Sequence, residues 1–351
     1  MHSLLEKIIK TNGIKLHIVT QGKGPLVIFC HGFPGHWSHW RHQLAAVATA
    51  GFTGVAVDMR GYGESSRPSL LADYNMDQQV ADMLGLLQAL DAEKAIFVGQ
   101  DFGAPLVWNM AIREPSCVVG VVGISVPFDH DYYGRSCLGH LAADELSEEA
   151  LSSLLVASPV NPPSTGFNAI AEHQFFHAHY FQAEGLADKE LGENAREFLS
   201  RIYWGLSANG SLGDWADYPS AGTQYLDVLP QAPGLPWPWM SEQDMDLIER
   251  AYLTTGSDSA FIGGLASYRV ADINWHIGDK YAALNVEVPA LFIAGENDPV
   301  MASVNDATLD RMKQRVPDLR GIKIIPDAGH FVQLENANLT SAAIVNFIAG
   351  L

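Results

Sequence analysis

The sequence predicts an α/β protein with a mostly parallel β-sheet, helices on both faces and a helical segment inserted between two parts of the core. Short apolar runs of strand length recur along the chain, and stretches of helix length separate the early ones. A long middle region contains no such run. Alternation of strand and helix indicates parallel strands joined by helical crossovers.

The predicted elements begin with a hairpin over 7–22, whose two strands are joined by Asn12-Gly13, a pair that favours a tight turn. Later runs are continuously apolar, as expected of strands buried on both faces. These runs are PLVIFC (25–30), GVAVD (54–58), AIFVG (95–99), VVGVVGIS (118–125), ALFIAG (290–295) and IKIIPDA (322–328). Helices are predicted over 39–50, 76–90 and 104–115.

The middle of the chain, about 132–279, replaces strand runs with helical patterns and an aromatic-rich loop, YPSAGTQYLDVLPQAPGLPWPWM. The run VPALFIAG then resumes the sheet. We therefore expect three segments: a first part of the core over 1–131, a helical cap over 132–279 and a second part of the core over 280–351.

Composition and net charge limit the classes of partner that this protein can have. The 351 residues are 48% hydrophobic and 17% charged, which allows a sizeable core. A formal net charge of -19 repels phosphate backbones and anionic lipids, so neither nucleic acid nor a membrane is expected as a partner. Three cysteines form no disulfide framework, and no signal peptide or apolar span is evident, so we expect a cytoplasmic protein.

Asp101 lies in FVGQDFGAPLVW, between a strand run and a helix run, with Gly99 and Gly103 on either side. A sharp strand–turn–helix elbow leaves little room for Cβ atoms and presents its central residue above the sheet. Serine is usual there; a carboxylate would instead displace a leaving group from sp³ carbon and form an alkyl-enzyme ester. The alternative is an ordinary N-cap aspartate.

Hydrolysis of such an ester needs a base and an orienting acid. His330 in PDAGHFVQLEN is the expected base, and Asp298 in AGENDPV is the expected acid. Asp129 in SVPFDHD is the competing acid. Nucleophile, acid and histidine then follow the chain order typical of nucleophile-elbow hydrolases. The backbone N–H groups of Phe33 and Phe102 are the expected oxyanion hole.

These motifs resemble the epoxide hydrolases of the α/β-hydrolase fold, and the resemblance covers nearly the whole chain. HGFPG resembles the family's His-Gly-X-Pro loop, whose X-Pro bond is typically cis. VGQDFGA, GENDPV and AGHFVQLEN of this sequence resemble the family's elbow, acid and histidine segments, in that order. YFQAEGLADKEL and LPWPWMSEQDMD resemble segments of its cap. The resemblance implies epoxide hydrolysis without a cofactor.

In this family two cap tyrosines hold the epoxide oxygen and protonate it. Tyr268 in GGLASYRV matches one of them, whereas His177 in FFHAHYFQ stands where the other is expected. A histidine N–H can also donate to the oxygen of the opening epoxide, and an imidazolium is the stronger acid. The pair of His177 and Tyr268 resembles the His/Tyr pair found in a minority of the family. Tyr180, one helical turn on, is the alternative donor, and His177 could instead be a packed cap residue.

Other functions and sites remain open at this stage. A dehalogenase could use the same nucleophile, although Phe102 offers no side-chain donor for a halide and Trp37 only a weak one. An esterase would need a serine, and a non-catalytic receptor would be expected to lose the base or the acid. Two groups of closely spaced histidines could suggest a metal site, but no cysteine or acidic cluster completes either group at the spacing of a zinc site. The histidines are His36, His39 and His42 in one group and His177 and His179 in the other.

The predicted substrate is a small apolar epoxide, with water as co-substrate and no metal or cofactor. We expect aromatic side chains to line the pocket, namely Phe33, Trp37, Trp108, Phe176 and Tyr180. A homo-oligomer is compatible with the sequence.

Overall fold

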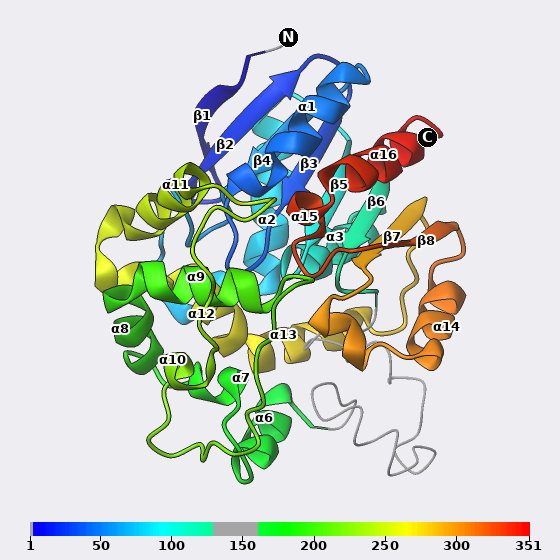
Figure 1. Cartoon of the computed structure of the whole chain (residues 1–351). Coiled ribbons are helices and arrows are strands. Elements are labelled where there is room, and N and C mark those ends of the chain that lie inside the picture. The colour runs from blue at the N-terminus through cyan, green and yellow to red at the C-terminus, as the bar shows by residue number, and fades with distance from the viewer. Residues whose placement is uncertain (1–2, 129–160) are drawn as a thin grey trace.

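The structure, a computed structural model, describes residues 3–128 and 161–351. An 8-stranded sheet in the order β1-β2-β4-β3-β5-β6-β7-β8 forms its centre (Figure 1). The strands are β1 (Leu5–Thr11), β2 (Ile14–Gly22), β3 (Leu26–Cys30), β4 (Thr53–Val57), β5 (Ala95–Gln100), β6 (Val118–Ile124), β7 (Ala290–Gly295) and β8 (Leu319–Ile325). Each predicted run therefore contains a strand, although the bounds of the last one differ.

The hairpin and the parallel sheet follow the predicted pattern. β1 and β2 are antiparallel, and Asn12 and Gly13 both have positive φ at their turn. β2 also pairs antiparallel with β4, whereas the remaining pairs, from β4 to β8, are parallel. β8 begins earlier than the sequence predicts, since Arg320 and Gly321 interrupt its apolar run. An edge strand can carry such residues because part of it faces solvent.

Helices cover both faces of the sheet. α1 (Arg41–Thr49) and α16 (Ala337–Ile348) lie over one face, and α2 (Met76–Ala89) and α3 (Gly103–Arg113) lie over the other (Figure 1). Side chains of a strand alternate between the faces: Phe29 packs with Trp40 in one core cluster, and Ile28 packs in the other. This two-sided burial explains the continuous apolar runs.

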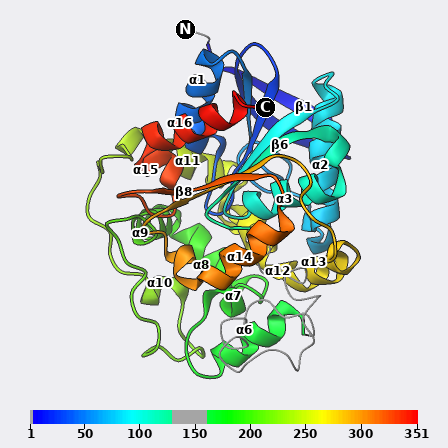
Figure 2. The same cartoon turned by 90° about the vertical axis from the view of Figure 1, so that its right-hand side faces the viewer.

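Between β6 and β7 the described residues form helices and one isolated β-bridge, between Trp237 and Met240. Most of these helices gather beyond one end of the sheet in both views (Figures 1 and 2). The predicted start of the cap, at residue 132, lies outside the described residues. The helices are α6 (Pro163–Ala171), α7 (His177–Tyr180), α8 (Leu186–Glu193), α9 (Ala195–Gly205), α10 (Tyr225–Val228), α11 (Glu242–Tyr252), α12 (Ile262–Arg269) and α13 (Ala271–Gly278).

Short elements complete the fold. They are the 3-10 helices η1 (Trp37–Trp40), η2 (Leu71–Tyr74), η3 (Pro115–Cys117), η5 (Leu253–Thr255), η6 (Ser257–Ser259), η7 (Asp279–Tyr281) and η8 (Pro299–Ser303), and the helices α14 (Asp306–Arg315) and α15 (Val332–Glu335). In the described parts of the chain, none of the helices has the length and apolarity that crossing a bilayer requires.

Candidate active site

Asp101 occupies a sharp elbow between β5 and α3. Its φ of 53° is left-handed, a conformation that few non-glycine residues adopt. A Cβ added at Gly99 would lie 2.0 Å from the Gly103 carbonyl oxygen, so the turn closes only around a residue without a side chain. The N-cap of α3 is Phe102, without a side-chain capping bond, which rules out the N-cap alternative for Asp101.

The two carboxylate oxygens of Asp101 have different surroundings. Oδ1 accepts a 2.7 Å hydrogen bond from the Phe33 backbone N–H, whereas Oδ2 lies 3.6 Å from His330 Nε2. A Cβ added at Gly32 would lie 2.1 Å from Oδ1 and 2.5 Å from the Phe102 nitrogen, so both atoms face the same short stretch of backbone. The structure therefore brings both predicted oxyanion-hole residues to one side of Asp101.

His330 and Asp298 come together at the carboxyl ends of β8 and β7. His330 Nδ1 lies 3.1 Å from Asp298 Oδ1, and both residues are buried. Burial lowers the pKa of His330, but the Asp298 and Asp101 carboxylates outweigh it and raise the pKa to about 10. The alternative acid, Asp129, lies outside the described residues.

Tyr268 and His177 approach these loops from the helices above the sheet. Their ring centroids are 5.4 Å apart, with Tyr268 on α12 and His177 at the start of α7. The Tyr268 ring also lies 4.9 Å from Phe102 and 6.5 Å from Phe33. The predicted cap pair therefore borders the two loops that flank Asp101.

Aromatic rings enclose His177. Its centroid lies 5.1 Å from Phe176, 5.4 Å from Trp215 and 5.9 Å from Tyr225, which stacks on it. Burial lowers the His177 pKa to about 4, although the charge of Asp101 acts in the opposite direction. A neutral imidazole is thus the form present near pH 7, not the imidazolium considered from the sequence.

Tyr180, the alternative donor, has its hydroxyl committed elsewhere. It donates a 2.7 Å hydrogen bond to Glu190 Oε2. The buried Glu190 carboxylate also accepts from the backbone N–H groups of Tyr225 and Leu226. Glu190 thus fixes the start of α10, a role that no sequence motif indicated, and the geometry favours His177 over Tyr180.

Two predicted pocket residues lie elsewhere, so the prediction that they line the pocket is wrong. The Trp108 ring packs where a Cβ on Gly123 would stand, and its Nε1–H donates to the Val126 carbonyl at 3.1 Å, so it belongs to the contact between α3 and β6. Trp37 begins η1, which leads the chain into α1, and its ring packs against the core cluster of Phe29 and Trp40. An aromatic residue near a motif in sequence need not point toward it.

The clustered histidines have separate surroundings. His36 Nδ1 is 2.9 Å from Ser38 Oγ, and His39 Nε2 is 2.5 Å from the Tyr203 hydroxyl. His179 Nδ1 is 3.0 Å from Asn168 Oδ1. Among the residues that the structure describes, no three His, Cys, Asp or Glu side chains are arranged to hold a metal ion.

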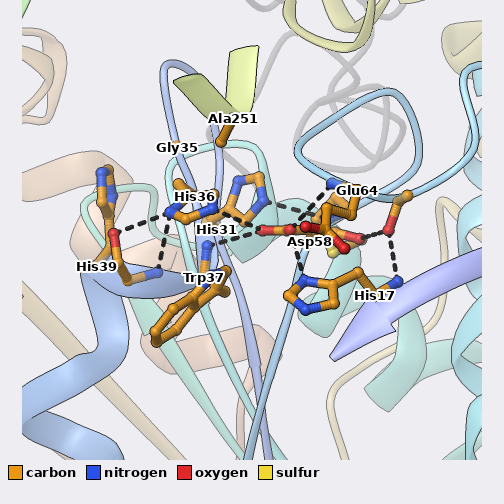
Figure 3. A network of polar contacts seen from close by, with 12 residues as sticks. His17, His31, Gly35, His36, Trp37, His39, Asp58, Glu64 and Ala251 are labelled. Carbon is orange, nitrogen blue, oxygen red and sulfur yellow. Dashed lines mark hydrogen bonds and ion pairs between the residues drawn. The ribbon is translucent and has the colours of Figure 1, made fainter. Parts of the chain in front are cut away.

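A buried network around Asp58 supports the loop that carries Phe33 (Figure 3). Asp58 Oδ2 is 2.8 Å from His17 Nδ1, and Oδ1 accepts from the Trp37 backbone N–H at 3.0 Å. His31 Nδ1 lies 2.8 Å from the Gly32 carbonyl oxygen. No sequence motif assigned Asp58 a role, although an acidic residue at the end of a predicted strand run was a usable signal.

Comparison with known proteins agrees with this geometry. Residues 25–146 match the family model described as "alpha/beta hydrolase fold". The chain is 34% identical over 349 residues to epoxide hydrolase A of Mycobacterium tuberculosis, covering 99% of this chain and 98% of that protein. It is 31% identical to an epoxide hydrolase of Caballeronia sordidicola, covering 97% and 92%.

Solved structures lead to the same family. The crystal structure of epoxide hydrolase A from Mycobacterium thermoresistibile superimposes with a TM-score of 0.83 at 32% identity, covering 99% of each chain. Potato (Solanum tuberosum) epoxide hydrolase I superimposes with a TM-score of 0.80 at 27% identity, covering 99% of this chain and 100% of that one. With relatives above 30% identity over nearly its whole length, this chain belongs to the epoxide hydrolase family of the α/β-hydrolase fold.

Proposed function

We propose that this chain hydrolyses an epoxide to a vicinal diol in two steps. In the first step, Asp101 Oδ2 attacks a ring carbon from the side opposite its C–O bond. That bond breaks, an ester forms, and the ring oxygen takes the Tyr268 proton while the His177 N–H donates a hydrogen bond to it. The observation that carries the proposal is the pairing of Oδ1 with the Phe33 N–H, which leaves Oδ2 available for attack.

The second step hydrolyses the ester. His330 Nε2 accepts a proton from water, and the resulting hydroxide adds to the ester carbonyl carbon. The Phe33 and Phe102 N–H groups stabilise the negative charge that develops on Oδ1. Collapse breaks the bond between Cγ of Asp101 and the alkyl oxygen, which takes the proton from His330, so the diol leaves. The carboxylic acid left at Asp101 then gives up the second proton of the water, and a proton returns to the Tyr268 oxygen, so both groups are restored. Asp298 keeps the His330 ring oriented.

The proposed reactants are a small, uncharged, largely apolar epoxide and water. The aromatic surroundings of His177 and Tyr268 support an apolar substrate, and a net charge of -19 disfavours an anionic one. We assign the described residues 161–279 to the cap that the sequence predicts over 132–279, and place that part beside this site. Cysteine usage supports a cytoplasmic location, and a homo-oligomer is compatible with the proposal.

Mass spectrometry tests the covalent scheme. Asp101→Ala should abolish diol formation while leaving the circular dichroism spectrum and melting temperature near those of the wild type. His330→Gln, mixed with styrene oxide as probe, should accumulate an adduct on Asp101, because only ester hydrolysis is disabled. An adduct on another residue, or diol formation by Asp101→Ala, would refute the scheme.

Dehalogenation is the second candidate reaction, because an aspartate nucleophile can also displace a halide. Phe102, the residue after the nucleophile, presents an apolar ring that lies 4.9 Å from Tyr268. Its side chain has no N–H with which to hold a leaving halide. Diol production from styrene oxide should therefore greatly exceed bromide release from 1-bromobutane, and the reverse order would favour the dehalogenase.

A further inference from the structure

Gln100 directly precedes Asp101 and is buried, with 1% of its surface exposed. Its Nε2 lies 3.0 Å from His330 Nε2 and donates to the His330 carbonyl oxygen at 3.2 Å. The proposed reaction gives Gln100 no role, although its amide touches the ring nitrogen that must accept a proton from water.

The orientation of the Gln100 amide follows from its neighbours. A carbonyl oxygen only accepts, so the group next to the His330 carbonyl must be the NH₂ and not the oxygen. At the other end of the amide, Gln333 Nε2 lies 3.5 Å from Gln100 Oε1. Gln100 therefore presents an N–H to His330 Nε2, which can accept it only when that nitrogen carries no proton.

The Gln100 N–H favours an unprotonated Nε2, whereas the charged groups around His330 favour its protonated form. Asp298 Oδ1 lies 3.1 Å from Nδ1 and Asp101 Oδ2 lies 3.6 Å from Nε2, and both carboxylates favour the imidazolium. Glu335 interacts electrostatically with His330 and accepts from the backbone N–H groups on either side of it, at Gly329 and Phe331. A further titratable neighbour, His39, is buried, and burial lowers its pKa well below the usual value, so it is neutral.

Esterification of Asp101 removes one of these negative charges. We propose that Gln100 is a positioning residue that then keeps His330 Nε2 unprotonated, so that His330 can accept a proton from water. The inference rests on the proposed function, because only a two-step mechanism needs a neutral His330 in its second step. Gln100 contacts neither the epoxide nor the attacking water in this scheme and acts through its hydrogen bond to His330 Nε2.

The structure supplies a matched control. Ser125 Oγ also donates to the His330 carbonyl oxygen at 3.2 Å. Ser125→Ala therefore removes one anchor of the His330 backbone, as Gln100→Met does, but the Nε2 contact belongs to Gln100. A merely structural role for Gln100 predicts the same behaviour from both variants.

The test measures the titration of His330 by NMR of ¹³C-labelled histidine, with His330→Gln identifying the signal. An Asp101→Ala background removes the carboxylate charge, as esterification does, and adds no donor. There, Gln100→Met should raise the pKa of His330 by roughly one unit, the size expected from losing one hydrogen bond to the neutral form. Ser125→Ala should leave that pKa within about 0.2 units, below the contribution of one hydrogen bond.

Kinetics supply a second measurement. With Asp101 intact, Gln100→Met should shift the acid limb of ester hydrolysis upward by the same amount, roughly one pH unit, in single-turnover experiments. An unchanged His330 titration in Gln100→Met, or an equal shift in Ser125→Ala, would overturn the inference. The titration uses no epoxide, so it can succeed or fail independently of whether the wild type forms a diol.

Discussion

His177 should act during ring opening as a neutral imidazole that donates a hydrogen bond from its N–H to the ring oxygen, and the pH dependence of ester formation can show this. A pKa of about 4 leaves roughly one imidazole in a thousand protonated at pH 7, because each pH unit changes the ratio tenfold. Ester formation that depends on the neutral form should then be flat from about pH 6 to 8.5. An imidazolium donor with an unperturbed pKa near 6.5 would instead lose rate about tenfold per unit above that value.

Ester formation is best measured in His330→Gln, where the ester accumulates, by rapid quench across this pH range. His177→Phe should slow the step roughly 10²- to 10³-fold, as for the loss of one oxyanion donor. His177→Tyr should keep much of the rate, since a phenol restores a donor. A rate that falls tenfold between pH 7 and 8 with His177, but not with tyrosine, would refute the neutral-donor reasoning. A silent His177→Phe would show that His177 is a packed residue.

Three further outcomes are expected. Asp298→Asn should slow ester hydrolysis about 10²- to 10⁴-fold and leave ester formation nearly unchanged in single-turnover kinetics; the same effect from Asp129→Asn instead would move the acid. Tyr180→Phe should cost about 1–3 kcal/mol of unfolding free energy, because buried Glu190 loses a donor, with ester formation close to the wild-type rate. Asp58→Asn should cost roughly 3–5 kcal/mol in urea unfolding, by breaking a buried pair with His17.

The Asp58 loss should also depend on pH. Burial lowers the pKa of His17, but its hydrogen bond and attraction to Asp58 outweigh burial and raise the pKa above 6.5. The stability that the charged His17 contributes is therefore complete below pH 6.5, and it is lost as the pH rises through the raised pKa of the folded state. Burial raises the pKa of Asp58, but its histidine neighbours hold it below 3.8, so its contribution is complete above pH 3.8. The difference in unfolding free energy between the wild type and Asp58→Asn should therefore be largest between pH 3.8 and pH 6.5. A larger difference at pH 9 would contradict the assignment.

Local sequence determined most of the core. Continuous apolar runs mark strands that are buried on both faces, and their spacing with helix-length segments requires a parallel sheet. The pairing of Asn12 with Gly13 encodes a turn whose residues need positive φ. Asp101, Asp298 and His330 could be selected because each follows a strand run, and the carboxyl ends of parallel strands meet at one edge. Where the apolar pattern fails, at Arg320 in β8, the prediction of the strand start failed too.

Tertiary structure decided what local pattern cannot encode: which way a side chain points and what meets it from distant parts of the chain. Trp37 and Trp108 turn into the core because η1 and α3 direct them there. The Tyr180 hydroxyl is bound by Glu190 and is therefore not available to the epoxide. Gln100 contacts His330, although the two residues are 230 positions apart in the sequence. Burial among aromatic rings, not the imidazole itself, makes His177 neutral. Desolvation depends on every group packed around a side chain, so these properties arise only when the fold is complete.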